Sequence, residues 1–153
     1  MGQYVVVNKS AEVNGQTILS VVKGMPGYES TALSILANKG ISNVKADAWY
    51  PQQSWLDAFK EIANKIGVNT LRSIGAKIIE SAQWPPTVNS IETALASIDI
   101  AYHMNHSISG KSLFDPATGK MTEGIGHYKF EKVSNNEFKV ICENPYPCDF
   151  DKG

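Results

Sequence analysis

Four side chains of types that bind metals lie in two short stretches of this 153-residue chain. His103 and His106 stand in "YHMNH", and Cys142 and Cys148 stand in "CENPYPCDFD". A helix places two residues three apart on one face, so both imidazoles could reach one ion. Two prolines stiffen the segment between the cysteines and would hold the two thiols at a fixed separation. Two imidazoles and two thiolates suit a tetrahedral zinc site, so these four residues are predicted to bind zinc.

The same residues have an ordinary structural interpretation. The histidines could lie on the surface of an amphipathic helix, and Cys142 could be a small core residue. The C-x5-C spacing is also wider than the spacings of common zinc fingers. Asp99 stands four residues before His103, where it could orient that imidazole as a hydrogen-bond acceptor or form only a surface pair with it.

The third histidine, His127, has two alternatives. It lies in "GIGHYKFEKV", where side chains alternate between the faces of a strand. If His127 points inward with Ile125, it faces the helix that carries the other histidines. If Tyr128 points inward instead, His127 faces solvent, and a shift of one residue decides between the two.

The elements that must position these residues are helices followed by strands. Residues 16–25 are interpreted as a strand or a buried lead-in segment. Apolar residues at helical spacing predict helices over 31–39, from Pro51 to Gly67, over 70–83, and from Thr87 to about Asn105. Alternation then predicts a hairpin of residues 124–133 and 138–142, with a further strand around Leu113. The predicted fold is a single α+β domain over residues 1–153, with about four helices in an N-terminal layer packed on a C-terminal antiparallel hairpin or small sheet.

Composition excludes several classes of protein. The chain is 42% apolar and 19% charged with a net charge of −1, which is typical of a globular domain and unlike a nucleic-acid binder. No apolar run is long enough to span a bilayer, and the N-terminus lacks the pattern of a signal peptide. Two cysteines do not make a disulfide framework, so we expect a cytoplasmic protein with free or metal-bound thiols.

Aromatic residues near the predicted helix ends suggest a second kind of site. They could line an apolar pocket for a small molecule, although ordinary packing at helix ends is the alternative. The residues predicted for this pocket are Trp49, Tyr50, Trp84 and Tyr102.

One stretch, "YPQQSWLDAFKEIANKIGVNTLRSIGAKIIESAQWP", resembles a known superfamily. That superfamily joins 4-vinyl reductase domains, transport-particle subunits and haem nitric-oxide-binding domains. The resemblance is carried by a helix with a central "xxGxxhhE" pattern, matched here by Gly75 through Glu80, and by the order of elements over residues 30–145. It implies helices followed by an antiparallel sheet, with a small or lipidic ligand between them, in a sensory or carrier domain.

The same resemblance bears on the cofactor and on the C-terminus. The haem-binding branch has a Tyr-x-Ser-x-Arg clamp, whereas the only arginine here is Arg72, so haem is disfavoured relative to zinc. In the 4-vinyl reductase branch, cysteines near the last hairpin precede a Gly that opens a final helix. Because "CENPYPCDFDKG" stops at such a Gly, either that helix is absent or the chain has been cut from a longer one.

Three functions from different classes remain open on the sequence alone. The first is a cytoplasmic sensory or binding domain for a small apolar or tetrapyrrole-like molecule, with a His/Cys metal site. In it, the ligand would favour one docking of the hairpin on the fourth helix. The second is an enzyme that uses Cys148 as nucleophile or a zinc-bound water. The third is a ligand-free module that forms a homodimer through an apolar helix face.

Overall fold

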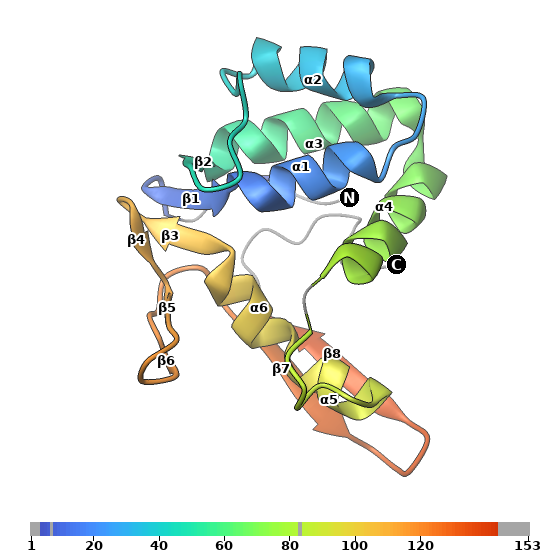
Figure 1. Ribbon diagram of the computed structural model, residues 1–153, viewed down its shortest axis with the longest axis vertical. Coiled ribbons are helices and arrows are strands. Elements are labelled where there is room, and N and C mark those ends of the chain that lie inside the picture. The colour runs from blue at the N-terminus through green and yellow to red at the C-terminus, as the bar shows by residue number, and fades with distance from the viewer. Residues whose placement is uncertain (1–3, 7, 83, 144–153) are drawn as a thin grey trace.

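Helices dominate the first half of the chain in the computed structural model, which describes residues 4–6, 8–82 and 84–143. The helices are α1 (Gly15–Lys23), α2 (Glu29–Asn38), α3 (Gln52–Ile66) and α4 (Val68–Ser81). Figure 1 shows α1, α2 and α3 grouped at one end of the molecule, with α4 beside them. The predictions of helices at α2, α3 and α4 are confirmed.

Small antiparallel sheets complete the α+β fold, which confirms the predicted class. One sheet has the strand order β2-β1-β3-β4, and it consists of β1 (Ala11–Asn14), β2 (Trp49–Pro51), β3 (His106–Ile108) and β4 (Lys111–Ser112). A short pair follows, β5 (Phe114–Asp115) with β6 (Lys120–Met121). The predicted C-terminal hairpin is present as β7 (Tyr128–Lys132) paired with β8 (Phe138–Cys142), in a register that sets Phe130 opposite Val140.

The interpretation of residues 16–25 as a strand is wrong, because these residues belong mainly to α1. Asn14 caps this helix by accepting a hydrogen bond from the Thr17 amide at 2.8 Å. The β-branched residues Ile18, Val21 and Val22 recur at helical spacing and are all buried. Tertiary packing thus overrides their intrinsic preference for strands.

Gly15 permits the start of the helix, since an added Cβ would lie 1.8 Å from the carbonyl oxygen of Lys45.

The fourth predicted helix is shorter than expected and is divided into α5 (Ile91–Ala96) and α6 (Ile98–Met104). A capping box between Ser90 and Thr93 starts α5 after a turn, so residues 87–90 are not helical. Ser97 ends α5, and its hydroxyl donates to the Ala94 carbonyl at 2.8 Å. The interruption leaves α6 as a separate short helix that carries both Asp99 and His103.

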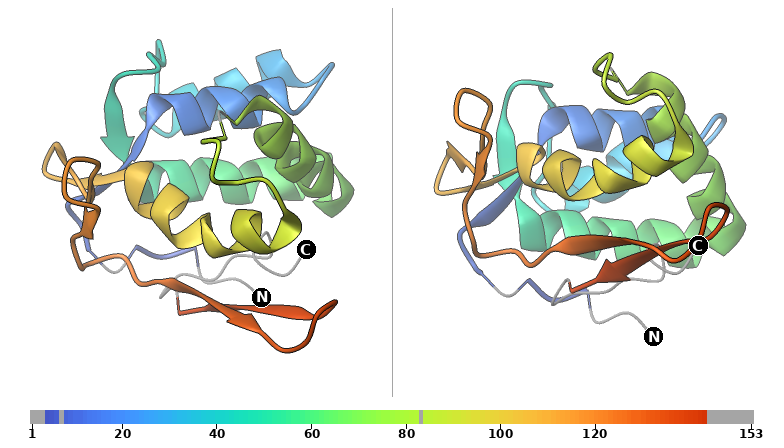
Figure 2. Two further views of the ribbon diagram at one scale, coloured as in Figure 1. Left: turned by 60° about the horizontal axis from the view of Figure 1, so that its bottom comes forward. Right: turned by 90° about the horizontal axis from the view of Figure 1, so that it is seen from below.

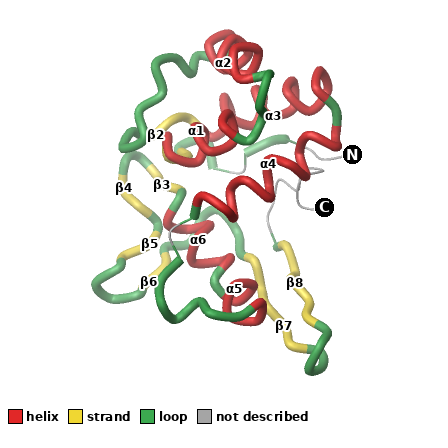
Figure 3. The backbone as a smooth tube through the Cα atoms, turned by 45° about the vertical axis from the view of Figure 1, so that its right-hand side comes forward, coloured by secondary structure: helices red, strands yellow, loops and turns green. Residues whose placement is uncertain are grey.

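The hairpin lies against the two short helices rather than against α1–α3 (Figures 2 and 3). Both α5 and α6 contact β7, and the Lys132 ammonium on β7 donates to Glu92 on α5 at 2.7 Å. A small apolar cluster, separate from the main helical core, joins Ala11 of β1 to Leu113 and to Ile125, which lies shortly before β7. The histidines of the chain gather beside this small cluster, where the strands and α6 meet.

Candidate metal centre

Helix α6 places Asp99 and His103 one turn apart on the same face, as residues separated by four positions in a helix must be. The His103 side chain is fully buried. Its Nδ1 donates to the backbone carbonyl of Asp99 at 2.9 Å and lies 3.5 Å from the Asp99 carboxylate. The predicted proximity of this pair is confirmed, with His103 buried and Asp99 half-buried rather than exposed on the surface.

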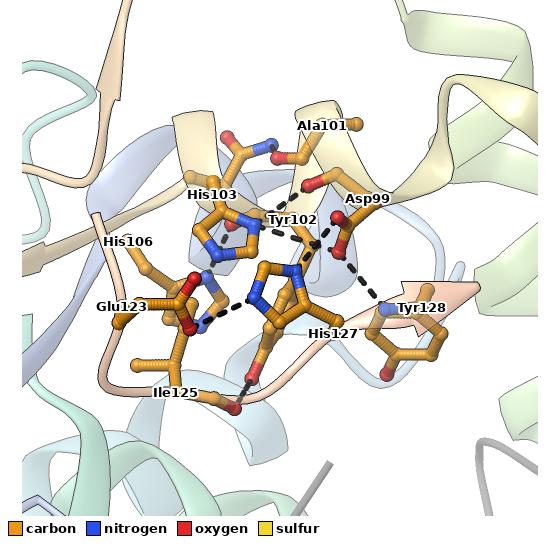
Figure 4. A network of polar contacts seen from close by, with 10 residues as sticks. Asp99, Ala101, Tyr102, His103, His106, Glu123, Ile125, His127 and Tyr128 are labelled. Atoms are coloured by element: carbon orange, nitrogen blue, oxygen red, sulfur yellow. Dashed lines mark hydrogen bonds and ion pairs between the residues drawn. The ribbon is translucent and has the colours of Figure 1, made fainter. Parts of the chain in front are cut away.

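The third histidine approaches the same carboxylate from the other side. His127 Nδ1 lies 2.9 Å from Asp99 Oδ2, and the Tyr128 amide donates to Asp99 Oδ1 at 2.9 Å. Ile125 is buried and the His127 side chain is only 25% exposed, so His127 shares the inward face with Ile125. The alternative in which His127 faces away from the helix is therefore wrong. Figure 4 shows the two imidazoles converging on Asp99 from different segments.

Asp99, His103 and His127 form a group that could hold a metal ion. One nitrogen or oxygen ligand atom from each residue lies within 4.8 Å of those of the other two. The rings of His103 and His127 face each other with centroids 4.8 Å apart and planes inclined by 30°. Two imidazoles and a carboxylate are ligands that zinc and non-haem iron use in proteins.

One atom of this group has no hydrogen-bond partner among the described residues. The Nε2 of His103 is buried, yet nothing in the described part of the chain pairs with it. An unpaired polar atom in the interior costs about 1–3 kcal/mol, and such atoms are rare in folded proteins. A bound metal ion would remove this cost, because an imidazole nitrogen with a free lone pair is a ready ligand.

The charge of His127 is favoured by its neighbours. Hydrogen bonds to the carboxylates of Asp99 and then Glu123 raise the pKa of the His127 imidazole above its usual value. Glu123 accepts from His127 Nε2 at 2.9 Å, and its own side chain is 81% exposed. Both ring nitrogens of His127 thus face acidic oxygens, which indicates a position suited to positive charge.

His106, which was predicted as a ligand, is not a member of the three-residue group. It begins β3, and its Nδ1 donates to the Tyr102 carbonyl at 2.7 Å. Its ring packs on that of Tyr102 with centroids 4.6 Å apart. Burial lowers the pKa of His106 from 6.5 to about 4, because the interior disfavours the charged imidazolium.

Of the two predicted cysteine ligands, the structure describes only Cys142. Cys142 ends β8 opposite Tyr128, and its thiol is free and half-buried. It is not a member of the three-residue group. Cys148 lies outside the described residues, so the predicted zinc site of two histidines and two cysteines stays a prediction. Of its four residues, the three-residue group contains His103.

The four aromatic residues predicted for a ligand pocket come from separate parts of the fold. Trp49 and Tyr50 are in β2, whereas Trp84 follows α4 and donates from Nε1 to the Ile79 carbonyl at 3.2 Å. Tyr102 belongs to α6, and its hydroxyl donates to the Ile125 carbonyl at 2.9 Å. The predicted aromatic pocket stays a prediction.

A hollow of about 220 Å³ lies elsewhere, between α1 and α4. It contains none of the four aromatic residues and is lined by Ser20, Lys23, Lys77 and Glu80.

The pairing of Asp99 with His103 was predicted from their spacing of four residues, but the contact of Asp99 with a second histidine was not. The alternative in which His127 points inward implied that its side chain faces the helix that carries Asp99. The contact between Glu123 and His127, four residues apart outside any helix, carries no comparable sequence signal.

No helix in the described ranges combines the length and the apolar character needed to cross a membrane. Comparisons with known proteins found no matching family model, no matching curated protein and no matching solved structure. The resemblance to the 4-vinyl reductase superfamily accordingly stays a prediction.

Proposed function

We propose that this protein is a metal-binding domain in which a divalent transition-metal ion joins α6 to the segment that leads into the β7–β8 hairpin. The observation that carries the proposal is the buried Nε2 of His103, which has no partner among the described residues and belongs to a group with Asp99 and His127. Zinc is the first candidate, because it accepts imidazole and carboxylate ligands without a strong preference for one geometry.

The position of the centre suggests what metal binding would do. Asp99 and His103 belong to α6, whereas His127 immediately precedes β7. An ion held by both segments would therefore stabilise the docking of the hairpin on α6. If the undocked arrangement is also populated, the ion would shift the population toward the docked one, as a sensory domain requires. The domain would then report metal, or a ligand that binds through the metal, by the position of its hairpin.

The apolar ligand, the thiol-dependent enzyme and the homodimer are separate proposals, and each depends on a different part of the chain. A small apolar or tetrapyrrole-like ligand remains a proposal that requires the aromatic pocket. The thiol-dependent enzyme would require Cys148, which lies outside the described residues. A homodimer through an apolar helix face is a separate alternative, tested by light scattering.

The test is zinc titration of chelator-washed protein by calorimetry, with His127→Gln as the main variant. We expect about one zinc per chain in the wild type and at least a tenfold weaker affinity in the variant, because a ligand is removed. His127 is chosen because its side chain is partly exposed, so the variant should fold. Asp47→Asn is the matched control, since Asp47 is exposed and far along the chain from the group. Equal zinc affinity in wild type and His127→Gln would overturn the proposal.

A further inference from the structure

The hydrogen-bond partners of the two histidines indicate which of their ring nitrogens are open to a ligand. His103 Nδ1 lies 2.9 Å from the Asp99 carbonyl oxygen, which can only accept a hydrogen bond. The proton of neutral His103 is therefore on Nδ1, and the lone pair is on the buried Nε2 that has no partner among the described residues. His127 directs its own Nδ1 to Asp99 Oδ2 at 2.9 Å. Both imidazoles thus use the same nitrogen to contact Asp99.

The Asp99 carboxylate is already engaged by donors. One oxygen accepts from His127 Nδ1 and the other from the Tyr128 amide, each at 2.9 Å. To bind an ion directly, this carboxylate would have to give up at least one of these bonds and leave its donor unpaired. Metal-binding histidines commonly direct the nitrogen that does not bind the metal at a carboxylate or a backbone carbonyl, and Asp99 supplies one of each.

The opposite edge of His127 meets a different carboxylate. Glu123 Oε2 lies 2.9 Å from His127 Nε2, and the Glu123 side chain is 81% exposed. Figure 4 shows Glu123 on the side of the two rings away from Asp99. An exposed carboxylate can turn from a ring N–H to an ion at little cost, because no other side chain among the described residues holds the oxygens of Glu123.

We propose that Glu123 is a ligand of the metal centre, that His103 and His127 bind the ion through Nε2, and that Asp99 is a positioning residue that holds both imidazoles through Nδ1. This assignment rests on the proposed function, since it concerns the same centre. It places the ion on the Glu123 side of the rings and leaves the hydrogen bonds of Asp99 intact. Glu123 then becomes the ligand that links the centre to solvent.

The first test is zinc titration of Glu123→Gln beside the matched control Glu131→Gln, an exposed glutamate on β7. Glutamine keeps the size of the side chain and removes its charge. We expect Glu123→Gln to weaken zinc binding by about 10-fold or more and Glu131→Gln to leave it within about twofold of the wild type. Because Glu123 is exposed, its replacement should not affect folding, which circular dichroism would verify.

The second test is a long-range ¹H–¹⁵N correlation spectrum of the zinc-loaded wild type, which reports the state of each ring nitrogen. We expect Nε2 of His103 and of His127 to show the shift of a metal-bound nitrogen, with Nδ1 of both protonated. Metal-bound Nδ1 atoms, or equal zinc affinity in Glu123→Gln and the wild type, would overturn the inference while the proposed metal centre stands. Absence of zinc binding in the wild type would instead remove the proposed function itself.

Discussion

Replacing Asp99 with alanine is expected to destabilise the metal-free protein by about 3 kcal/mol, because this carboxylate holds the hairpin segment on α6. It accepts from the Tyr128 amide and from His127 Nδ1, each at 2.9 Å. A hydrogen bond to a charged group contributes about 1.5–3 kcal/mol. The Asp99 side chain is 17% exposed, so water can enter after the truncation and recover part of this loss. We therefore take the lower value, about 1.5 kcal/mol, for each of the two hydrogen bonds, which gives about 3 kcal/mol in total.

The assay is urea unfolding followed by circular dichroism, with thermal unfolding alongside. In a chain of this length, about 3 kcal/mol corresponds to a fall of about 6–12 °C in the unfolding midpoint. Native-state hydrogen exchange gives a local reading, since the Tyr128 amide loses its acceptor and should exchange faster. Asp57→Ala is the control, because the exposed Asp57 accepts one side-chain hydrogen bond within the described part of the chain, from Gln53, and its loss should change stability by less than about 0.5 kcal/mol. An Asp99→Ala variant as stable as the control, with the Tyr128 amide still protected, would refute this reasoning.

Three further predictions concern the metal, the buried imidazole and the start of α1. Zinc at about 100 times its dissociation constant should stabilise the wild type by about 2.7 kcal/mol, a rise of about 5–11 °C in the unfolding midpoint; a rise of the same size in His127→Gln would contradict the proposed centre. The low pKa of His106 means that the unfolded chain binds more protons than the folded one between pH 4 and 6.5. His106 alone should therefore cost the metal-free protein about 3 kcal/mol of stability as pH falls through this window, measured by urea unfolding. A His106→Gln variant should lose less, and parallel pH profiles of the two proteins would disprove the assignment. Gly15→Ala should unfold at much lower urea concentration than the wild type, because its Cβ would lie 1.8 Å from the Lys45 carbonyl oxygen; near-native stability would show that this close approach is wrong.

Elements with a strong period could be predicted from the sequence, and those decided by single contacts could not. The core-facing residues of α3, such as Phe59 and Ile62, repeat at helical spacing, and the strands of the hairpin alternate around a polar turn. Helix α1 was ambiguous because Val21 and Val22 are β-branched and favour strands, and only their packing in the core decides for a helix. The division at Ser97 depends on one hydroxyl that caps the preceding turn, and serine is common inside helices as well.

The candidate centre could be predicted from the sequence only in part, because some of its members follow from helical spacing and others from strand register or the path of a loop. His103 and its helical neighbour Asp99 followed from the spacing of four residues. The inward orientation of His127 depends on the strand register, which a one-residue shift reverses, so the sequence left it open. The contact with Glu123 depends on the path of a loop, and no periodicity predicts such a path. Cys142 looked suitable by residue type, but its position opposite Tyr128 is set by the register of the hairpin, and it is not a member of the three-residue group.

The central claim is that one metal ion binds where α6 meets the segment before β7. The most direct measurement is elemental analysis of purified, chelator-washed and zinc-reloaded protein after removal of free metal, with His103→Gln and His127→Gln prepared in parallel. We predict about one zinc per chain in the wild type and much less in both variants. No retained metal in the wild type, or the same amount in the variants, would contradict the claim and leave the two histidines as structural residues held by Asp99 and, for His127, also by Glu123.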